Sequence, residues 1–190
     1  MSTTEGPNNS SAVTTSGSGV SWSNTADSIV DNSAFADSNI ANYARTNKDT
    51  ELYILDDSSS QIGNNKANVS SIPVESTPST YTTYGGTNDL WGATLTASVI
   101  NSSNFGFRIG YGFDTSTISD YLDVSNFGFS IPTGATIEGV EFEVSHSQWD
   151  LESLIGIVDV RVRHVRATIH YSIGGSATSV SSTLFFGGGI

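Results

Sequence analysis

Residues 105–113 read Phe-Gly-Phe-Arg-Ile-Gly-Tyr-Gly-Phe, and this stretch decides the fold class. Its aromatic and aliphatic side chains fall on every second position, while glycine and arginine occupy the positions between them. Alternation with a period of two is typical of a β-strand that buries one face. The stretch therefore predicts one long strand whose aromatic face lies in a core.

The pentapeptide Ser-Asn-Phe-Gly-Phe occurs twice, at residues 103–107 and 125–129, and an isoleucine follows two residues after each copy. The second copy has the same alternation, so it predicts another core strand over residues 127–131. A glycine inside a strand often marks the close approach of another backbone, and we expect crowding at both Gly106 and Gly128. We interpret the two copies as similar core strands rather than as an internal duplication, because their flanking residues differ.

Further strands are predicted on both sides of this region. Residues 51–55 and 81–84 are short β-type runs that end at turn signals. Residues 140–144 alternate valine or phenylalanine with glutamate, which predicts one buried and one solvated face. Residues 160–162 and 165–171 also alternate, but in opposite phase.

A change of phase inside one strand requires an extra residue. Val160 and Val162 have the opposite parity to Val165, so we expect a β-bulge near Arg163 and His164. One window, residues 27–42, is compatible with a helical turn, although asparagine and serine dilute it.

The composition supports an all-β fold. Hydrophobic residues make up 36% of the 190 residues, and 19 glycines with many Ser, Thr and Asn residues account for much of the rest. Short strands separated by polar turns are typical of an antiparallel β-sandwich or jelly roll. We expect such a sandwich over residues 21–174, an extended arm over residues 1–20 and a tail over residues 175–190.

The two tails carry the candidate partner-binding residues. The arm has almost nothing to bury, so it cannot offset its ordering entropy alone, and we expect contact with neighbouring subunits to order it. The C-terminal tail ends in an apolar hook on a glycine stem, which could close the domain's own core or dock on a neighbour. The predicted partner-binding residues are Val20, Trp149, Leu184, Phe185, Phe186 and Ile190.

The charge disfavours two classes of partner. The net charge is −12 and seven residues are basic, so the chain lacks the broad basic surface that nucleic-acid binding needs. An anionic membrane is disfavoured for the same reason, and no apolar run is long enough to cross a bilayer. There is no cysteine, and no secretory signal pattern follows Met1.

Catalytic patterns are weak. No Gly-x-Ser-x-Gly motif occurs, and His146, His164 and His170 lack the context of a catalytic triad, so we interpret them as structural. Glu141 and Glu143 lie about 6–7 Å apart on one strand face, a spacing compatible with glycoside hydrolysis. Alternating glutamates are also common on a solvated strand face, and we prefer that interpretation.

The acidic residues and the tryptophans could form two other kinds of site. Carboxylates gather in two loop regions without the spacing of an EF-hand, and we interpret them as solvated rather than as calcium ligands. Carbohydrate binding would need exposed aromatic side chains; Trp91 is expected in the core, and Trp149 is the tryptophan we expect to be exposed. The carboxylates are Asp27, Asp31 and Asp37 in one region and Asp114, Asp120 and Asp123 in the other, and the third tryptophan is Trp22.

Several blocks of the sequence form a set that is found together in other proteins. The first block is residues 125–140, which read Ser-Asn-Phe-Gly-Phe-Ser-Ile-Pro-Thr-Gly-Ala-Thr-Ile-Glu-Gly-Val. The second block is residues 83–92 (Thr-Tyr-Gly-Gly-Thr-Asn-Asp-Leu-Trp-Gly), continued by residues 102–107. With Trp22-Ser23-Asn24 and residues 165–171, these blocks resemble mostly uncharacterised β-rich proteins of tailed bacteriophages, and the resemblance covers roughly residues 22–172. In the family the Ser-Ile-Pro block precedes the Leu-Trp-Gly block, whereas here it follows, so we transfer no strand order.

The resemblance implies a virion-associated structural protein without catalytic residues or cofactor. Our hypothesis is a non-enzymatic capsid decoration (cement) protein, a homotrimer bound to the major capsid protein or to neighbouring virion subunits. It would be made in the host cytoplasm without a signal peptide and act on the virion exterior. The alternative is a tail-fibre or receptor-binding domain that recognises host surface glycans.

Overall fold

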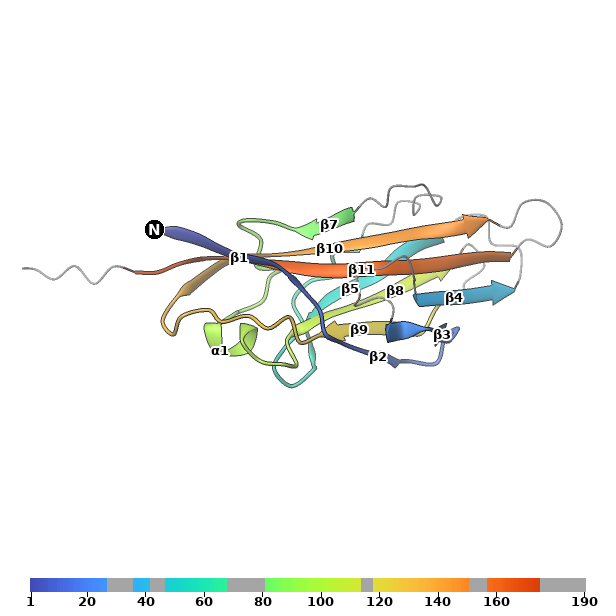
Figure 1. Ribbon diagram of the computed structural model, residues 1–190, viewed down its shortest axis with the longest axis horizontal. Coiled ribbons are helices and arrows are strands. Elements are labelled where there is room, and N and C mark those ends of the chain that lie inside the picture. Colours follow the sequence, from blue (N-terminus) through green and yellow to red (C-terminus); the bar gives the residue numbers. More distant parts are fainter. Residues whose placement is uncertain (27–35, 42–46, 68–80, 114–117, 151–156, 175–190) are drawn as a thin grey trace, which may run out of the picture.

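The computed structural model describes residues 1–26, 36–41, 47–67, 81–113, 118–150 and 157–174. Within these residues, strands β1 to β11 form two sheets that pack face to face (Figure 1). The expected antiparallel all-β sandwich is thus confirmed. In the described part of the chain, no helix has the length and apolar character needed to cross a bilayer.

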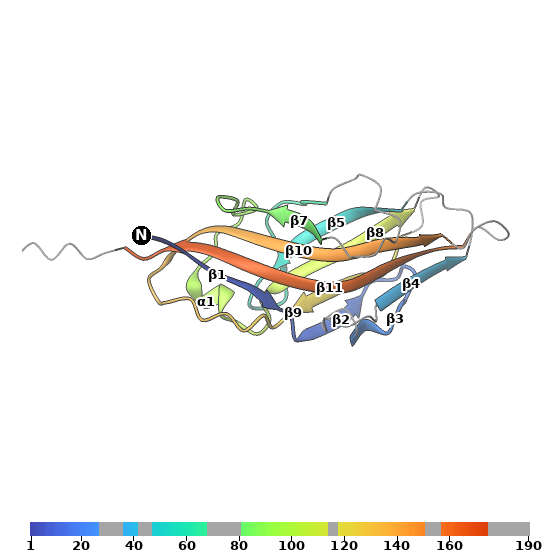
Figure 2. The same cartoon turned by 45° about the horizontal axis from the view of Figure 1, so that its top comes forward.

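The first sheet is built around a long hairpin. In spatial order it contains β3 (Trp22–Ser23), β4 (Ala36–Ala41), β11 (Ile157–Ser172), β10 (Thr136–Asp150) and β7 (Tyr81–Gly85). β1 (Ser2–Asn9) also pairs with β11, next to residues 166–172, while β4 pairs with residues 157–162. Because β10 occupies the other side of β11, β1 and β4 lie end to end along one side of it (Figure 2).

The second sheet covers the inner face of the first. Its order is β2 (Ala12–Ser16), β9 (Tyr121–Ser125), β8 (Gly106–Phe113), β5 (Asn47–Leu55) and β6 (Gln61–Ile62). The strand predicted from residues 105–113 is therefore confirmed as β8, a central strand of this sheet. Its inner-facing Phe107, Ile109 and Tyr111 are each 0% exposed.

The predicted bulge is present in the hairpin of β10 and β11. Ser145 pairs with His164 and His146 pairs with Val162, so Arg163 has no directly opposed residue. The extra residue changes the phase of β11. As a result, Val160 and Val162 before the bulge and Val165 after it are all fully buried.

The second Ser-Asn-Phe-Gly-Phe copy is not a strand, and that prediction is wrong. β9 ends at Ser125, and the backbone turns into the left-handed region at Asn126 (φ 59°) and Gly128 (φ 69°). These conformations take the segment out of the ladder, because strand pairing needs extended backbone. Phe127 and Phe129 are nevertheless buried, so the alternation correctly identified core side chains.

The expectation that contact with neighbouring subunits orders the extended N-terminal arm is also wrong. Residues 2–9 form β1 in the first sheet, and residues 12–16 form β2 on the edge of the second sheet. Between them Ser10 is buried, and its Oγ donates a hydrogen bond to the Ser125 carbonyl at 2.6 Å. Backbone pairing with two open strand edges orders this segment, and Val13 is the apolar side chain that it packs against the core.

The one described helix is not the predicted one. Residues 36–41 of the window expected to hold a helical turn form β4, and residues 27–35 lie outside the described residues. A single-turn helix, α1, instead spans Ala97–Ile100, and the Thr96 side chain caps it by accepting a hydrogen bond from the Val99 amide.

Aromatic rings fill the core between the sheets. Phe142 of β10 lies 4.8 Å, centroid to centroid, from Phe107 of β8, and this contact joins the two sheets. Trp91, Phe105 and Phe127 also contact Phe142, at 5.6, 6.2 and 5.9 Å. The prediction that Trp91 lies in the core is confirmed, since it is 0% exposed.

Candidate functional site

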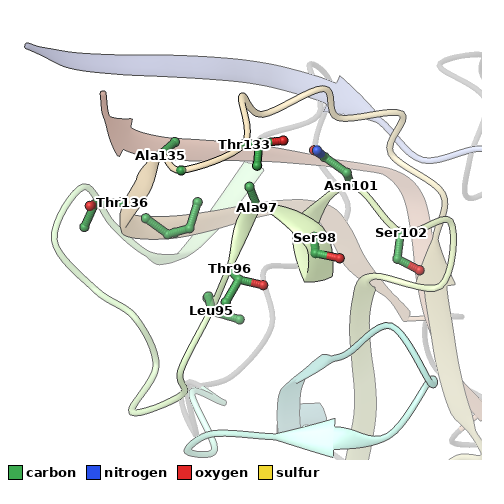
Figure 3. A pocket seen from close by; sticks show the side chains of 11 residues that line it. Leu95, Thr96, Ala97, Ser98, Asn101, Ser102, Thr133, Ala135 and Thr136 are labelled. Atoms are coloured by element: carbon green, nitrogen blue, oxygen red, sulfur yellow. The ribbon is translucent and has the colours of Figure 1, made fainter. Parts of the chain in front are cut away.

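A groove with a volume of about 840 Å³ opens at the end of the sandwich where α1 lies (Figure 3). This volume is in the usual range for ligand-binding sites, about 300–1,000 Å³. Two segments far apart in the sequence form it, one around α1 and one leading into β10. The residues that line it are Leu95, Thr96, Ala97, Ser98, Asn101, Ser102, Thr133, Gly134, Ala135, Thr136 and Ile137.

One asparagine fixes the two walls relative to each other. The Asn101 amide donates to the Ile131 carbonyl at 2.9 Å, and its side-chain oxygen accepts from the Ile131 amide at 2.7 Å. Asn101 follows α1, whereas Ile131 precedes the turn that closes with a hydrogen bond from the Ala135 amide to the Pro132 carbonyl. The pair of hydrogen bonds therefore connects α1 to the opposite wall.

The groove is uncharged and partly apolar. Ala97 and Ile137 are buried at its base, and Leu95 is half-buried and packs against the core. The hydroxyl groups of Thr96 and Ser98 are exposed. Because the lining contains no acid, base or thiol, this arrangement suits binding an uncharged segment through apolar contacts and hydroxyl hydrogen bonds.

A cluster of polar side chains, separate from the groove, is buried between the sheets. The Tyr111 hydroxyl lies 2.9 Å from His146 Nδ1, and His146 Nε2 lies 2.9 Å from Thr82 Oγ1. Burial lowers the pKa of His146 to about 4. Burial, followed by the negative charge of Asp49, raises the pKa of Tyr84 far above its usual value, and Asp49 itself is 2% exposed.

The hydrogen bonds of this cluster favour a structural role. Both ring nitrogens of His146 have partners, and neither partner is a carboxylate, so the ring has no free nitrogen to take a proton from a substrate. The other two histidines make separate hydrogen bonds, His164 to the Tyr81 hydroxyl at 2.7 Å and His170 to the Thr4 hydroxyl at 3.2 Å. The structure thus distributes the three histidines over different contacts.

Two of the candidate carboxylates pair with arginines. Glu143 accepts two hydrogen bonds from Arg166, at 2.8 and 2.9 Å, and Asp123 accepts two from Arg108, both at 2.7 Å. Both carboxylate oxygens of Glu143 are therefore bound by Arg166, whereas Glu141 is half-exposed. Among the described residues, no three histidine, aspartate or glutamate side chains gather as metal ligands would.

Some of the acidic candidates cannot be placed. Asp27, Asp31 and Asp114 lie outside the described residues, as does the side chain of Asp37. Asp120 is half-buried, and its backbone carbonyl accepts a hydrogen bond from Trp22 Nε1 at 2.7 Å.

The structure describes only some of the predicted partner-binding residues. Val20 packs against the core, and its amide donates to the Ile118 carbonyl at 2.9 Å, so it belongs to the body of the sandwich. The backbone of Trp149 pairs with Asp159, while its side chain lies outside the described residues. The other predicted residues, Leu184, Phe185, Phe186 and Ile190, also lie outside them.

Sequence reasoning missed the groove. Its lining consists of small and hydroxyl-bearing residues that read as ordinary turns, so neither segment carried a signal that indicated the groove. No protein-family model, curated protein or solved structure matches this chain.

Proposed function

We propose that this chain is a non-enzymatic structural protein of a tailed-phage virion, namely a capsid decoration protein that stabilises the exterior of the head. The observation that supports it is the position of the two sequence blocks that resemble virion proteins. Residue 102 of one block and residues 133–137 of the other line the groove, although β8 and β9 separate the two blocks in the sequence.

The contacts between the two blocks are direct. Trp91 Nε1 donates to the Val140 carbonyl at 3.0 Å, and the Val140 amide donates to the Asp89 carbonyl at 3.0 Å. The rings of Phe105 and Phe129 meet edge to face at 6.2 Å. The similarity therefore follows one packed unit rather than unconnected short matches, which makes a shared structural role more plausible than coincidence.

The groove and the charge suggest how such a protein makes contacts. An uncharged groove suits a protein segment, since it contains no group that would select a charged ligand. A net charge of −12 favours approach to a basic docking surface. We propose a homotrimer that contacts the major capsid protein or neighbouring virion subunits after synthesis in the host cytoplasm.

The alternative function, recognition of host glycans at a tail fibre, has less support. Sugar binding commonly uses exposed aromatic rings, and Trp22 and Trp91 are 9% and 0% exposed. The glycan hypothesis therefore depends on Trp149, whose side chain lies outside the described residues.

Immunogold electron microscopy tests the proposal. Antibodies raised against the purified chain are applied to intact particles of the phage that encodes it, with pre-immune serum as the control. We expect regular labelling over the head. Labelling confined to the tail tip would support the glycan-binding alternative, and absence from purified particles would refute a virion role.

A second measurement tests stabilisation. Particles that lack the protein are heated with and without added chain, and DNA release is followed with an intercalating dye. We expect bound chain to raise the release temperature. An unchanged release temperature at full occupancy would contradict a cement role.

A further inference from the structure

The last described strand leads the chain to the edge of the groove. Ser172, the final residue of β11, pairs with Thr136, and Tyr171 pairs with Ile137. Both partners line the groove. Cα atoms of directly opposed residues in antiparallel strands lie about 4.5–5.5 Å apart. The segment after Ser172 therefore starts within one strand spacing of the groove wall.

The remaining chain is long enough to return to the groove. Residues 173–183 separate Ser172 from Leu184, and they are mostly Gly, Ser, Ala and Thr. Fully extended, these eleven residues span about 36 Å. A random coil of eleven residues has a root-mean-square length of about 18 Å. Both lengths allow the chain to reverse and reach the groove.

The end of the chain and the groove match in chemistry. Residues 173–190 contain no ionisable side chain, in a protein of net charge −12, and the groove lining contains none either. Leu184, Phe185 and Phe186 offer three large apolar side chains in a row. The groove offers the buried side chains of Ala97 and Ile137, and a Cβ added at Gly134 would meet no atom within 4 Å, so the wall is open at that point.

We propose that the groove beside α1 is the docking site for residues 184–186 of the same chain. A linker of this length gives an effective concentration of about 1 mM, which exceeds the micromolar concentrations at which a second copy would compete. In the free protein, the docked segment covers the apolar base of the groove. This inference concerns the isolated chain and does not depend on the proposed function.

Peptide binding to full-length protein tests the proposal. The probe is a fluorescein-labelled peptide of residues 182–190, followed by fluorescence anisotropy. The receptor is a full-length variant whose own hook is disabled by Leu184→Ser, Phe185→Ser and Phe186→Ser. We expect this variant to bind the peptide and the wild type to bind it about tenfold more weakly, because an effective concentration of about 1 mM competes with a Kd of about 100 µM.

Two further variants locate the binding site. Ser98 is exposed and lines the groove, so Ser98→Arg added to the hook-disabled variant should abolish peptide binding. Gln61 is exposed on β6 outside the groove lining, so Gln61→Arg makes the same charge change and should leave binding intact. Circular dichroism confirms that both variants are folded.

Three outcomes would overturn the proposal. Equal peptide binding to wild type and hook-disabled variant would show that the groove is open in the native chain. No binding to either would show that the groove does not recognise the hook. A wild-type oligomer in sedimentation velocity that the hook-disabled variant loses would identify a second copy as the occupant. Because no virion enters these assays, they leave the proposed function to be tested separately.

Discussion

His146 makes two hydrogen bonds inside the core, and its charge state links the stability of the fold to pH. The folded pKa is about 4, against 6.5 for an exposed histidine. Between these values the unfolded chain binds a proton that the native chain does not bind, so the free energy of unfolding falls as the pH falls. Between pH 7 and pH 4.5 we expect a loss of about 2–3 kcal/mol from this group.

Urea unfolding at the two pH values measures this loss. His146→Gln keeps a neutral hydrogen-bonding side chain and removes the titration, so its stability should change less with pH. Measurements go no lower than pH 4.5, so that two carboxylates do not add to the loss. Hydrogen bonds from Ser58 lower the pKa of Asp56, and hydrogen bonds from Lys66 and Trp91 lower the pKa of Asp89. The stability that these two groups contribute is therefore lost only at more acidic pH. An identical pH dependence in wild type and variant would contradict the assignment.

The two glycines of the repeated pentapeptide should respond differently to alanine. A Cβ on Gly106 would lie 1.9 Å from the Val124 carbonyl oxygen, a backbone atom of the paired strand. Gly106→Ala should therefore cost about 3 kcal/mol or more. A Cβ on Gly128 would meet no atom within 4 Å, and only its left-handed backbone resists substitution, so Gly128→Ala should cost about 1 kcal/mol.

Chemical denaturation of both variants checks this difference, and similar costs would contradict it. The expectation of crowding at Gly128 was wrong because the sequence pattern is the same at both sites while the backbone is not. Gly106 lies in a ladder, whereas Asn126 and Gly128, which both tolerate positive φ, turn the second copy away from one. Five identical residues thus predicted two buried phenylalanine pairs but could not determine the backbone that holds them.

At the scale of elements, the N-terminal segment tests how much stability two strands contribute when they pair with the edges of the sheets. Removing residues 1–16 would leave the β11 edge beside β1 and the β9 edge beside β2 without partners. We expect the melting temperature to fall by about 10 °C, since a loss of about 3 kcal/mol shifts a domain of this size by several degrees per kcal/mol.

The matched control keeps the backbone and removes side chains. Asn9→Ala with Thr14→Ala changes two exposed side chains on β1 and β2, so it should change the stability by less than about 0.5 kcal/mol. Differential scanning calorimetry compares the two proteins with the wild type. A deletion that melts at the wild-type temperature would show that β1 and β2 contribute nothing to the fold.

Side-chain pattern explains which elements could be predicted. The bulge at Arg163 was predictable because it changes the phase of a buried valine series, and that phase is written in the sequence. β1 and β2 were not predictable, because backbone hydrogen bonds hold most of their length, and the single core contact of Val13 gives no apolar alternation. α1 was missed for a similar reason, since a single turn capped by Thr96 is too short to show a helical period.

At the scale of the whole molecule, one ring joins the two sheets. Phe142, on β10 of the first sheet, contacts Phe107 of the second sheet and the rings of Trp91 and Phe127, which lie outside the strands. Phe142→Ala should lower the free energy of unfolding by about 4 kcal/mol, a large share of the 5–15 kcal/mol typical of a domain. Ile118→Ala removes an apolar side chain that is 47% exposed, so it should cost under about 1 kcal/mol.

Urea denaturation of the two variants measures these costs, and comparable values would contradict the central position of Phe142. The core was the most predictable part of the molecule because burial follows alternation along each strand. The groove was not predictable, since its walls come from residues 95–102 and 133–137, which meet only after the sheets have packed. Pairing between distant segments carries no signal within either segment alone.

The pairing of β1 with β11 also fixes an order of events during synthesis. Thr3 pairs with Tyr171, so the partner of β1 leaves the ribosome about 170 residues later. At roughly 5–20 residues per second, the N-terminal segment waits about 10–30 s without its strand edge. A nascent segment of Ser, Thr, Glu and Asn can wait in water without aggregating, which an apolar strand could not. The polar composition that conceals β1 in the sequence is thus suited to a strand that is made first and paired last.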